Sequence, residues 1–130
     1  MKSLKILFSI LLLAVVFSSC SNDDNRLATV KYQIVGLDSS ISQIKYNGST
    51  SAITIINPND FADGSDTKKI PINFLPFLTK LEVTATNTTS AVKHYVLAIY
   101  VDNVSSASYN LDVPANSTAS GETSFNILAN

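Results

Sequence analysis

The chain has 130 residues, of which nine are basic and ten acidic, so its formal net charge at pH 7 is −1. Charged residues make up 15% of the sequence, below the roughly 25% of an average soluble chain. Nucleic-acid binding depends on clustered Lys and Arg that neutralise phosphates, so this composition, which has no basic run, argues against a nucleic-acid partner.

The first nineteen residues have the pattern of an export signal. Lys2 and Lys5 form a basic n-region, and the apolar run over 6–17 that follows is interrupted only by Ser9. A membrane-spanning helix needs about 20 apolar residues, and this run is shorter. We therefore expect residues 1–19 to be a removable signal peptide and not a permanent anchor.

Cys20 is the single cysteine and directly follows Ser18 and Ser19. The arrangement resembles a lipobox, in which small residues precede a cysteine that carries diacylglycerol, although Phe17 stands where that box prefers Leu or Val. We predict lipidation at Cys20, with two or three acyl chains as the membrane anchor, because one chain alone holds only marginally. The alternative is a plain signal peptide with an incidental cysteine near its cleavage point.

Residues 20–27 are predicted to form an acidic tether. The stretch 21–25 is polar, includes Asp23 and Asp24, and cannot bury apolar area. It resembles the acidic signal that sends some Gram-negative lipoproteins to the cell surface, and a solvated linker is the alternative. We expect the protein in the bacterial cell envelope, lipid-anchored to the outer membrane, at its periplasmic face or at the cell surface.

Residues 28–130 alternate between short apolar-patterned runs and turn residues, without a sustained helical spacing. Leu81 and Val83, for example, alternate with Lys80 and Glu82, which predicts a strand with one buried face. The expected strands lie at residues 29–35, 41–46, 52–56, 69–74, 78–86, 92–101, 104–111 and 123–128. Seven or eight short strands in one domain of this size predict an all-β, immunoglobulin-like two-sheet β-sandwich.

Particular residues refine this arrangement. Asn47-Gly48 is the pair favoured in a type I′ turn, so the second and third strands should form a hairpin. Pro71 limits its strand to a sheet edge. The run from Tyr95 to Val101 is almost continuously apolar, which predicts a central strand in the middle of the core. Loops or turns are expected at residues 57–66, 87–90, 102–103 and 114–120.

His94 is the only histidine, so a Ser-His-Asp hydrolase would have to use it as its base. No nucleophile-elbow sequence accompanies it, and it lies beside Lys93 at the start of the long apolar strand. We interpret it as a half-exposed strand residue and expect no enzyme. Metal binding fails for a similar reason, because one histidine and a lipidated Cys20 cannot supply three or four ligands, and no cofactor is expected.

Asp60, Asp63 and Asp66 lie close together around Gly64 in the expected loop 57–66. Carboxylates on a flexible loop are suited to calcium, but their spacing differs from that of the calcium loop with ligands at alternating positions. A solvated acidic loop is the preferred interpretation, and calcium binding by the Asp60–Asp66 segment stays open.

Two further sets of residues have alternative interpretations. The tyrosines either line a groove or pack in the core and on the sheets, and we favour packing. They are Tyr32, Tyr46, Tyr95, Tyr100 and Tyr109. The Asn-x-Ser/Thr triplets are interpreted as turn chemistry, because a lipoprotein signal implies a bacterium. They begin at Asn47, Asn87, Asn103 and Asn116.

Four segments carry a family resemblance. They are Val30-Lys31-Tyr32-Gln33-Ile34-Val35-Gly36, Ile44-Lys45-Tyr46-Asn47, Leu81-Glu82-Val83-Thr84-Ala85-Thr86-Asn87 and Ile99-Tyr100-Val101-Asp102-Asn103. They resemble strands and the Tyr-Val-Asp-Gly turn of the mycobacterial membrane protein small family and its bacterial lipoprotein relatives. The resemblance implies a β-sandwich outside the membrane that assists an exporter of lipids or siderophores, and it carries no catalytic residue. Asn103 replaces the usual glycine, and a lipid anchor stands where mycobacterial members have a membrane-spanning helix.

These observations predict a non-enzymatic envelope lipoprotein, held to the membrane through lipid on Cys20. As a binding or transporter-accessory module, it would bind another envelope protein or an amphiphilic ligand through a sheet face or loops. A surface-displayed adhesion or structural module on the same fold is the alternative. An exposed apolar patch would favour the first hypothesis, whereas an enzyme would need a cleft holding two or more titratable groups.

Overall fold

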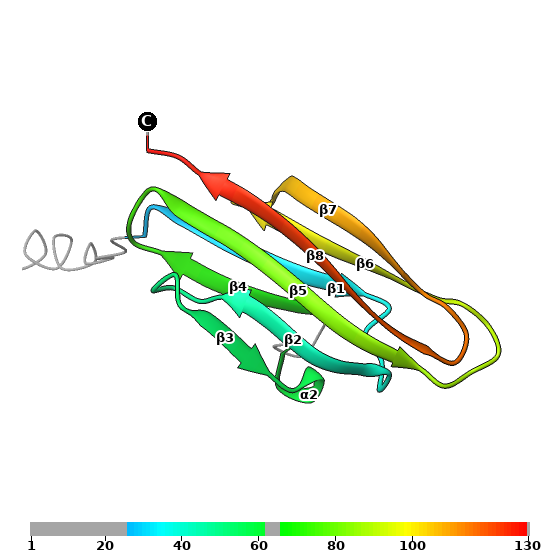
Figure 1. The fold of residues 1–130 in the computed structure, drawn as a ribbon. Helices are drawn as coiled ribbons and strands as arrows, with labels where there is room; N and C mark the ends of the chain where they lie inside the picture. Colours follow the sequence, from blue (N-terminus) through cyan, green and yellow to red (C-terminus); the bar gives the residue numbers. More distant parts are fainter. Residues whose placement is uncertain (1–25, 62–65, 130) are drawn as a thin grey trace, which may run out of the picture.

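The computed structural model describes residues 26–61 and 66–129 (Figure 1). Eight strands and one short helix are found in these residues. In chain order they are β1 (Ala28–Val35), β2 (Ile41–Asn47), β3 (Ile53–Ile56), α2 (Pro58–Phe61), β4 (Thr67–Ile72), β5 (Phe77–Asn87), β6 (Lys93–Val101), β7 (Val104–Val113) and β8 (Ser117–Ile127).

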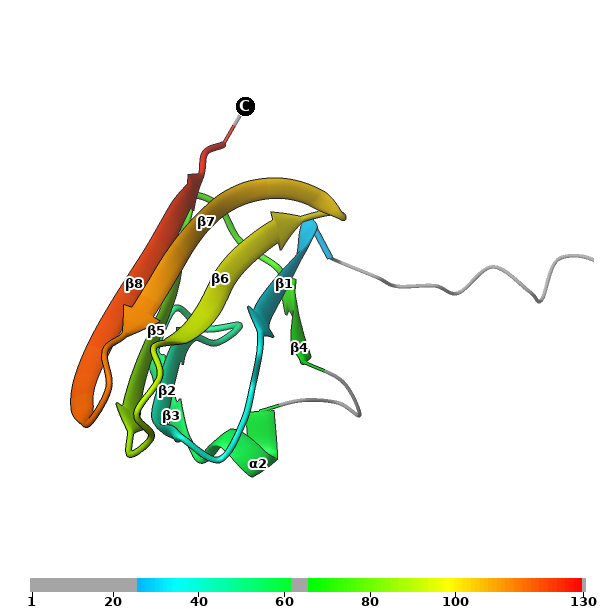
Figure 2. The same cartoon turned by 90° about the vertical axis from the view of Figure 1, so that its right-hand side faces the viewer.

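The strands form two antiparallel four-stranded sheets packed face to face, which confirms the predicted all-β two-sheet sandwich with the higher of the two expected strand numbers. One sheet has the order β4-β1-β6-β7 and is called the β1 sheet; the other has the order β3-β2-β5-β8 and is called the β5 sheet. The sheets meet closely where β7 lies beside β8, and α2 lies toward the opposite edge (Figure 2).

Strand alternation builds the core between the sheets. Val30, Tyr32 and Ile34 of β1 point inward and are fully buried, as are Leu81 and Val83 of β5. Inward side chains that follow a period of two are what a half-buried strand requires, and burying each large one stabilises the fold by about 1.5–3 kcal/mol. The core faces predicted for these two strands are therefore confirmed.

The predicted positions of two strands within the sheet are confirmed. β6 lies inside the β1 sheet between β1 and β7, and its inward residues Tyr95, Leu97 and Ile99 are buried. Its outer face is covered less completely, although Ala98 is also buried there. β4 is an edge strand, as the prediction from Pro71 required, because proline cannot donate a ladder hydrogen bond.

The β2–β3 hairpin is confirmed, but its predicted turn residues are wrong. Asn47 is the last residue of β2 and pairs with Ile53, and the positive φ of 61° falls on Ser51. The turn is closed by Ser51 N–H, which donates to the Gly48 carbonyl at 2.9 Å. Asn47 is drawn into the sheet because its side-chain amide donates to the Leu78 carbonyl of β5 at 2.8 Å.

Of two other predicted connections, one is confirmed and one is partly wrong. Asp102 and Asn103 have φ values of 48° and 68° and form a two-residue hairpin turn between β6 and β7, as predicted. The predicted loop 114–120 is wrong in its second half, because β8 begins at Ser117. Its exposed hydroxyl positions pair with β5: Ser120 lies 2.8 Å from the Thr84 hydroxyl.

The predicted loop 57–66 contains the short helix α2, which the sequence analysis did not anticipate. Its last residue, Phe61, is fully buried, with its ring centroid 6.0 Å from that of Tyr46. Tyr46 in turn lies 5.4 Å from Tyr32. This row of rings fills the side of the sandwich opposite β7 and β8, and aromatic pairs at such distances add to the stabilisation from burial.

Candidate functional site

The predicted lipid anchor at Cys20, the signal peptide 1–19 and most of the tether 20–27 lie outside the described residues. The described chain begins with Arg26 and Leu27 at one end of the sandwich, where β1 starts (Figure 1). The antiparallel order brings four other segments to the same end, one of which is the polar β2–β3 turn. We define the tether end as residues 26–29, 48–52, 73–78, 101–104 and 125–128, and the far end as residues 36–40, 88–92 and 114–116.

The tether end concentrates exposed apolar side chains. Six of the eleven large hydrophobic residues that are exposed in the described part of the chain lie within it. They are Leu27, Phe74, Leu78, Val104, Phe125 and Leu128. Val104 is 67% exposed and Leu128 65% exposed. Scattered apolar residues are normal on a surface, whereas the concentration of six at one end makes that end the candidate interaction surface.

A basic hollow of about 270 Å³ adjoins this end on the outer side of the β1 sheet. Its lining residues are Arg26, Thr29, Lys31, Lys69, Asp102 and Asn103. The Asp102 carboxylate already accepts a hydrogen bond of 2.8 Å from Thr29 N–H. Three cations therefore face one carboxylate that is engaged with the backbone, and the hollow favours an anionic group.

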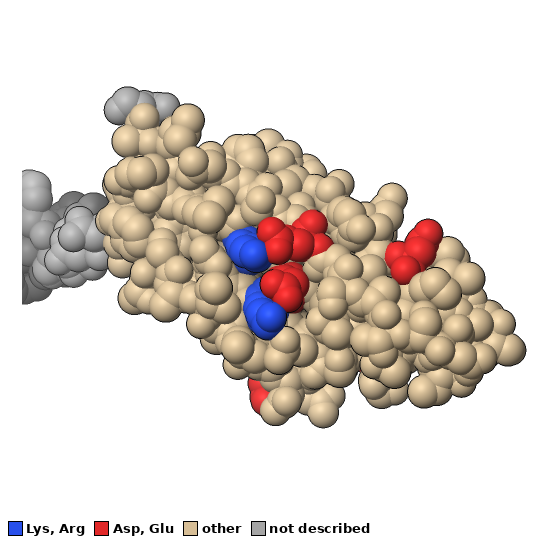
Figure 3. All heavy atoms as spheres, in the orientation of Figure 1, with Lys and Arg blue, Asp and Glu red and all other residues tan. Residues whose placement is uncertain are grey.

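A cluster of acidic and basic side chains lies at the centre of the outer face of the β5 sheet, and further acidic atoms appear apart from it in the same view (Figure 3). Lys45 Nζ lies 2.9 Å from Glu82, and Lys80 Nζ lies 2.6 Å from Glu122. The hydrogen bond to Glu122 raises the pKa of Lys80 above its usual value. Opposite charges on neighbouring strands favour this strand register. Because the pairs are partly exposed to solvent and neutralise one another, the cluster offers little net charge to a ligand.

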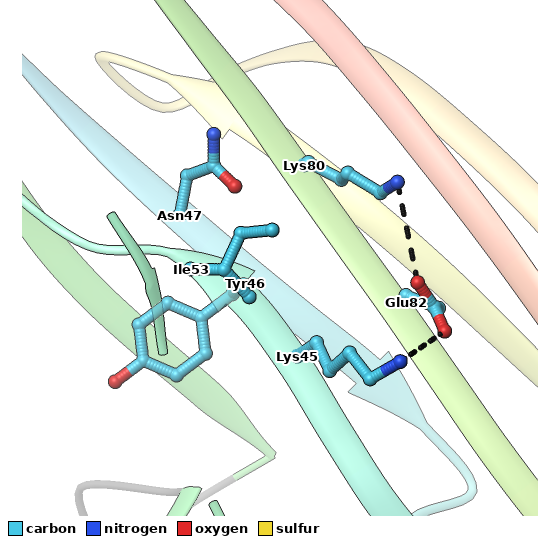
Figure 4. Close-up of a pocket in the computed structure, with 6 residues that line it drawn as sticks. All are labelled: Lys45, Tyr46, Asn47, Ile53, Lys80 and Glu82. Carbon is cyan, nitrogen blue, oxygen red and sulfur yellow. Dashed lines mark hydrogen bonds and ion pairs between the residues drawn. The ribbon is translucent and has the colours of Figure 1, made fainter. Parts of the chain in front are cut away.

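A small hollow beside this cluster is lined by Lys45, Asn47, Lys80 and Glu82, together with Tyr46 and Ile53 (Figure 4). Its volume of about 10 Å³ is the size of one water molecule and excludes an organic ligand. The buried Oδ1 atom of Asn47 has no hydrogen-bond partner among the described residues. The hollow is thus a place for solvent beside a buried amide.

At the far end, Asp38 binds the loop between β1 and β2 to β6. Its carboxylate lies 2.6 Å from Lys93 Nζ and accepts hydrogen bonds of 2.9 Å from Tyr95 O–H and Ser40 N–H. Burial raises the pKa of Asp38, but these hydrogen bonds outweigh it and hold the pKa below its usual value. Burial and the bond to Asp38 raise the pKa of Tyr95 to about 12. This network positions a loop, and its residues line neither of the two hollows described above.

His94 lies on the outer face of β6, opposite Asp112 of β7, and its Nδ1 is 2.7 Å from the Asp112 carboxylate. The two side chains are 71% and 66% exposed. Within the described residues the hydrogen bond of His94 goes to Asp112 and to no serine. This exposed pair lacks the nucleophile and the shielded position that acyl-transfer chemistry requires.

The calcium interpretation of the Asp60–Asp66 segment remains untested, because Asp63 and Gly64 lie outside the described residues. Asp60 is exposed in α2, and Asp66 Oδ2 accepts a hydrogen bond of 3.2 Å from the Gln33 side chain. No group of three or more His, Cys, Asp or Glu side chains suited to a metal is found in the described part of the chain.

The tyrosines mostly pack, as the favoured interpretation expected. Tyr32, Tyr46 and Tyr95 are buried in the core. Tyr100 lies under Lys31, whose Nζ is 4.1 Å from the ring centroid, and Tyr109 covers Gly121 across the β7–β8 contact. Of the asparagines, Asn103 and Asn116 take positive φ in turns, whereas Asn47 and Asn87 are buried. The turn interpretation is therefore correct for Asn103 and Asn116, and also for Asn87, whose Oδ1 accepts from Thr89 N–H two residues on, but it is wrong for Asn47 within β2.

The comparisons with known proteins add no family: no family model matches the chain, and no curated protein matches it. The resemblance to the mycobacterial membrane protein small family therefore stays a prediction. No helix within residues 26–61 and 66–129 is long and apolar enough to cross a membrane. The tether end is the surface that sequence reasoning missed, because it is assembled from five segments that are distant along the chain.

Proposed function

We propose that the protein is a lipid-anchored envelope lipoprotein whose β-sandwich acts as a non-enzymatic binding or transporter-accessory module. The observation that carries the proposal is the exposed apolar group at the tether end, whose first member, Leu27, lies seven positions after Cys20. An apolar surface at the attachment point suits a protein that works against a membrane or a membrane-embedded partner. Lipid on Cys20 would supply the anchor, with two or three acyl chains.

The anchor is tested by metabolic labelling with a fatty-acid analogue in a bacterial host. The wild-type protein should carry the label and fractionate with membranes. Cys20→Ala should be unlabelled and released, while the matched variant Asn25→Ala, changed in the tether only, should behave as the wild type. A mature wild-type chain with an unmodified thiol would contradict the proposal.

The binding role is tested by affinity capture of the membrane-anchored protein, followed by identification of co-purified proteins and lipids. Recovery of an exporter with the wild type, but not with Cys20→Ala, supports the accessory role. A protein fully exposed to external protease on intact cells, with no envelope partner, supports the alternative of a surface-displayed adhesion or structural module.

A further inference from the structure

We propose that the tether end is a bilayer-docking surface, with which the domain rests on the phospholipid membrane that holds its anchor. The inference deepens the proposed function and rests on lipidation of Cys20. It adds a defined orientation of the domain and a second, protein-mediated contact with lipid.

The length of the tether restricts which part of the domain meets the bilayer. Five residues, 21–25, lie between Cys20 and Arg26, so even a fully extended tether of six Cα–Cα steps spans at most about 21 Å. β5 alone has 11 residues and is about 37 Å long at the usual rise per residue. The far end therefore cannot face the bilayer while the tether end points away from it.

The chemistry of the tether end suits the boundary between headgroups and acyl chains. Its six exposed apolar residues lie at strand ends and in connecting loops, where they can enter the membrane interface while the strands keep their pairing. Phe74 is supported from behind by Phe77, with ring centroids 5.4 Å apart. Aromatic and aliphatic side chains held in this way bind at a membrane surface through buried apolar area.

The basic hollow supplies the complementary charge. Arg26, Lys31 and Lys69 face Asp102 beside the apolar group, and cations near a bilayer are attracted to anionic headgroups. Asp23 and Asp24 of the tether offset part of this attraction, so the apolar residues supply the larger share. At the far end, in contrast, Lys93 is paired with Asp38, and the nearby His94 with Asp112.

Two exposed valines at opposite ends give a matched test. Val104 is 67% exposed at the tether end, and Val92 is 48% exposed at the far end. Each is changed to cysteine in the full-length lipidated protein and labelled with an environment-sensitive fluorophore, since the Cys20 sulfur is blocked by its lipid. The protein is then reconstituted into vesicles of phosphatidylethanolamine and phosphatidylglycerol.

The expected result is a several-fold rise and a blue shift of emission at position 104, with a water-like signal at position 92. Lys31→Gln combined with Lys69→Gln should lower the signal at position 104 on these vesicles and change it less on phosphatidylcholine vesicles. The control Lys45→Gln, on the outer face of the β5 sheet, should leave it unchanged.

Flotation with vesicles and mass spectrometry of the mature chain separate the two proposals. A chain that lacks acyl groups and does not float overturns the proposed function. A lipidated chain that floats but shows equal, water-like emission at positions 104 and 92 overturns bilayer docking and leaves the anchor intact.

Discussion

At the scale of single residues, buried asparagines stabilise the strand ends. Asn87 is 1% exposed at the end of β5, and its Nδ2 donates to the carbonyls of Ala91, Val113 and Pro114 at 2.7–3.1 Å. Its Oδ1 accepts from Thr89 N–H at 2.9 Å. One amide thus joins the β5–β6 loop of the far end to the end of β7.

Asn87→Ala should therefore lower the free energy of unfolding by about 2–3 kcal/mol, because it leaves buried carbonyls without a donor. Urea denaturation followed by circular dichroism measures the loss. The control Asn110→Ala removes an exposed amide from β7 and should change stability by less than about 0.5 kcal/mol. Equal effects of the two substitutions would contradict the role given to Asn87.

Sequence chemistry suggested a turn at Asn47 because asparagine tolerates positive φ. The same amide also satisfies buried carbonyls, and which role it takes depends on distant neighbours. For Asn47 the deciding group is the Leu78 carbonyl, 31 residues away. Such a partner cannot be found from local pattern, whereas Asp102-Asn103 was predicted correctly because its turn is local.

Asp38 links residue chemistry to the pH dependence of stability. Its pKa is lower in the folded protein than in the unfolded chain, so its ionised form stabilises the fold. That stabilisation is complete above the usual carboxyl pKa and is lost as the pH falls below about 4. Because the side chain is 40% exposed, water screening limits the contribution to about 1 kcal/mol.

Asp38→Asn is accordingly expected to be less stable than the wild type at pH 7 and equally stable at the lowest pH at which both remain folded. Urea titrations across this range give the difference at each pH. Asp60→Asn, which changes an exposed carboxylate in α2, serves as the control and should show no such convergence. A difference that stays constant with pH would exclude the ionised Asp38 as its source.

At the scale of elements, the contact between β7 and β8 depends on a missing side chain. A Cβ atom at Gly121 would lie 2.6 Å and 2.9 Å from ring atoms of Tyr109 and 3.2 Å from Cβ of Leu111. The two sheets approach closely here because Gly121 leaves room for the ring.

Gly121→Ala should cost about 1–3 kcal/mol of stability through overpacking. Since the closest clash involves a half-exposed ring, Tyr109→Ala in the same chain should recover part of the loss, and a double-mutant cycle measures that coupling. Additive effects would show that the ring and the glycine do not determine the approach of these strands.

Strand positions were predictable wherever apolar and polar residues alternate over a buried face, as in β1 and β5. The start of β8 was missed because Thr118 and Ser120 look like loop residues, although their hydroxyls pair with Thr86 and Thr84 across the sheet. α2 was missed because four residues are too few to show a helical periodicity in the sequence. Its contact with the core is made by one buried ring, Phe61.

At the scale of the whole molecule, the number of strands indicated a sandwich, but not which strand enters which sheet. The chain changes sheets between β1 and β2, β3 and β4, β4 and β5, β5 and β6, and β7 and β8. This order is set by pairings between strands distant in sequence, such as β1 with β6. The tether end depends on this order of strands in the sheets, because the order brings residues 27, 74 and 128 to one end of the sandwich.

The position at which the core begins predicts that the sandwich folds without its lipid or tether. Leu27 N–H donates to the Ile72 carbonyl at 2.7 Å, and the core begins at Ala28. A chain starting at Arg26 should unfold in one cooperative transition, at the same urea midpoint as the complete mature protein in detergent. A chain starting at Lys31 should be at least about 3 kcal/mol less stable, because it lacks the buried Ala28 and Val30 and their pairing with β4. Equal midpoints for all three chains would mean that the start of β1 is dispensable, and that the tether end is held together by its other strands.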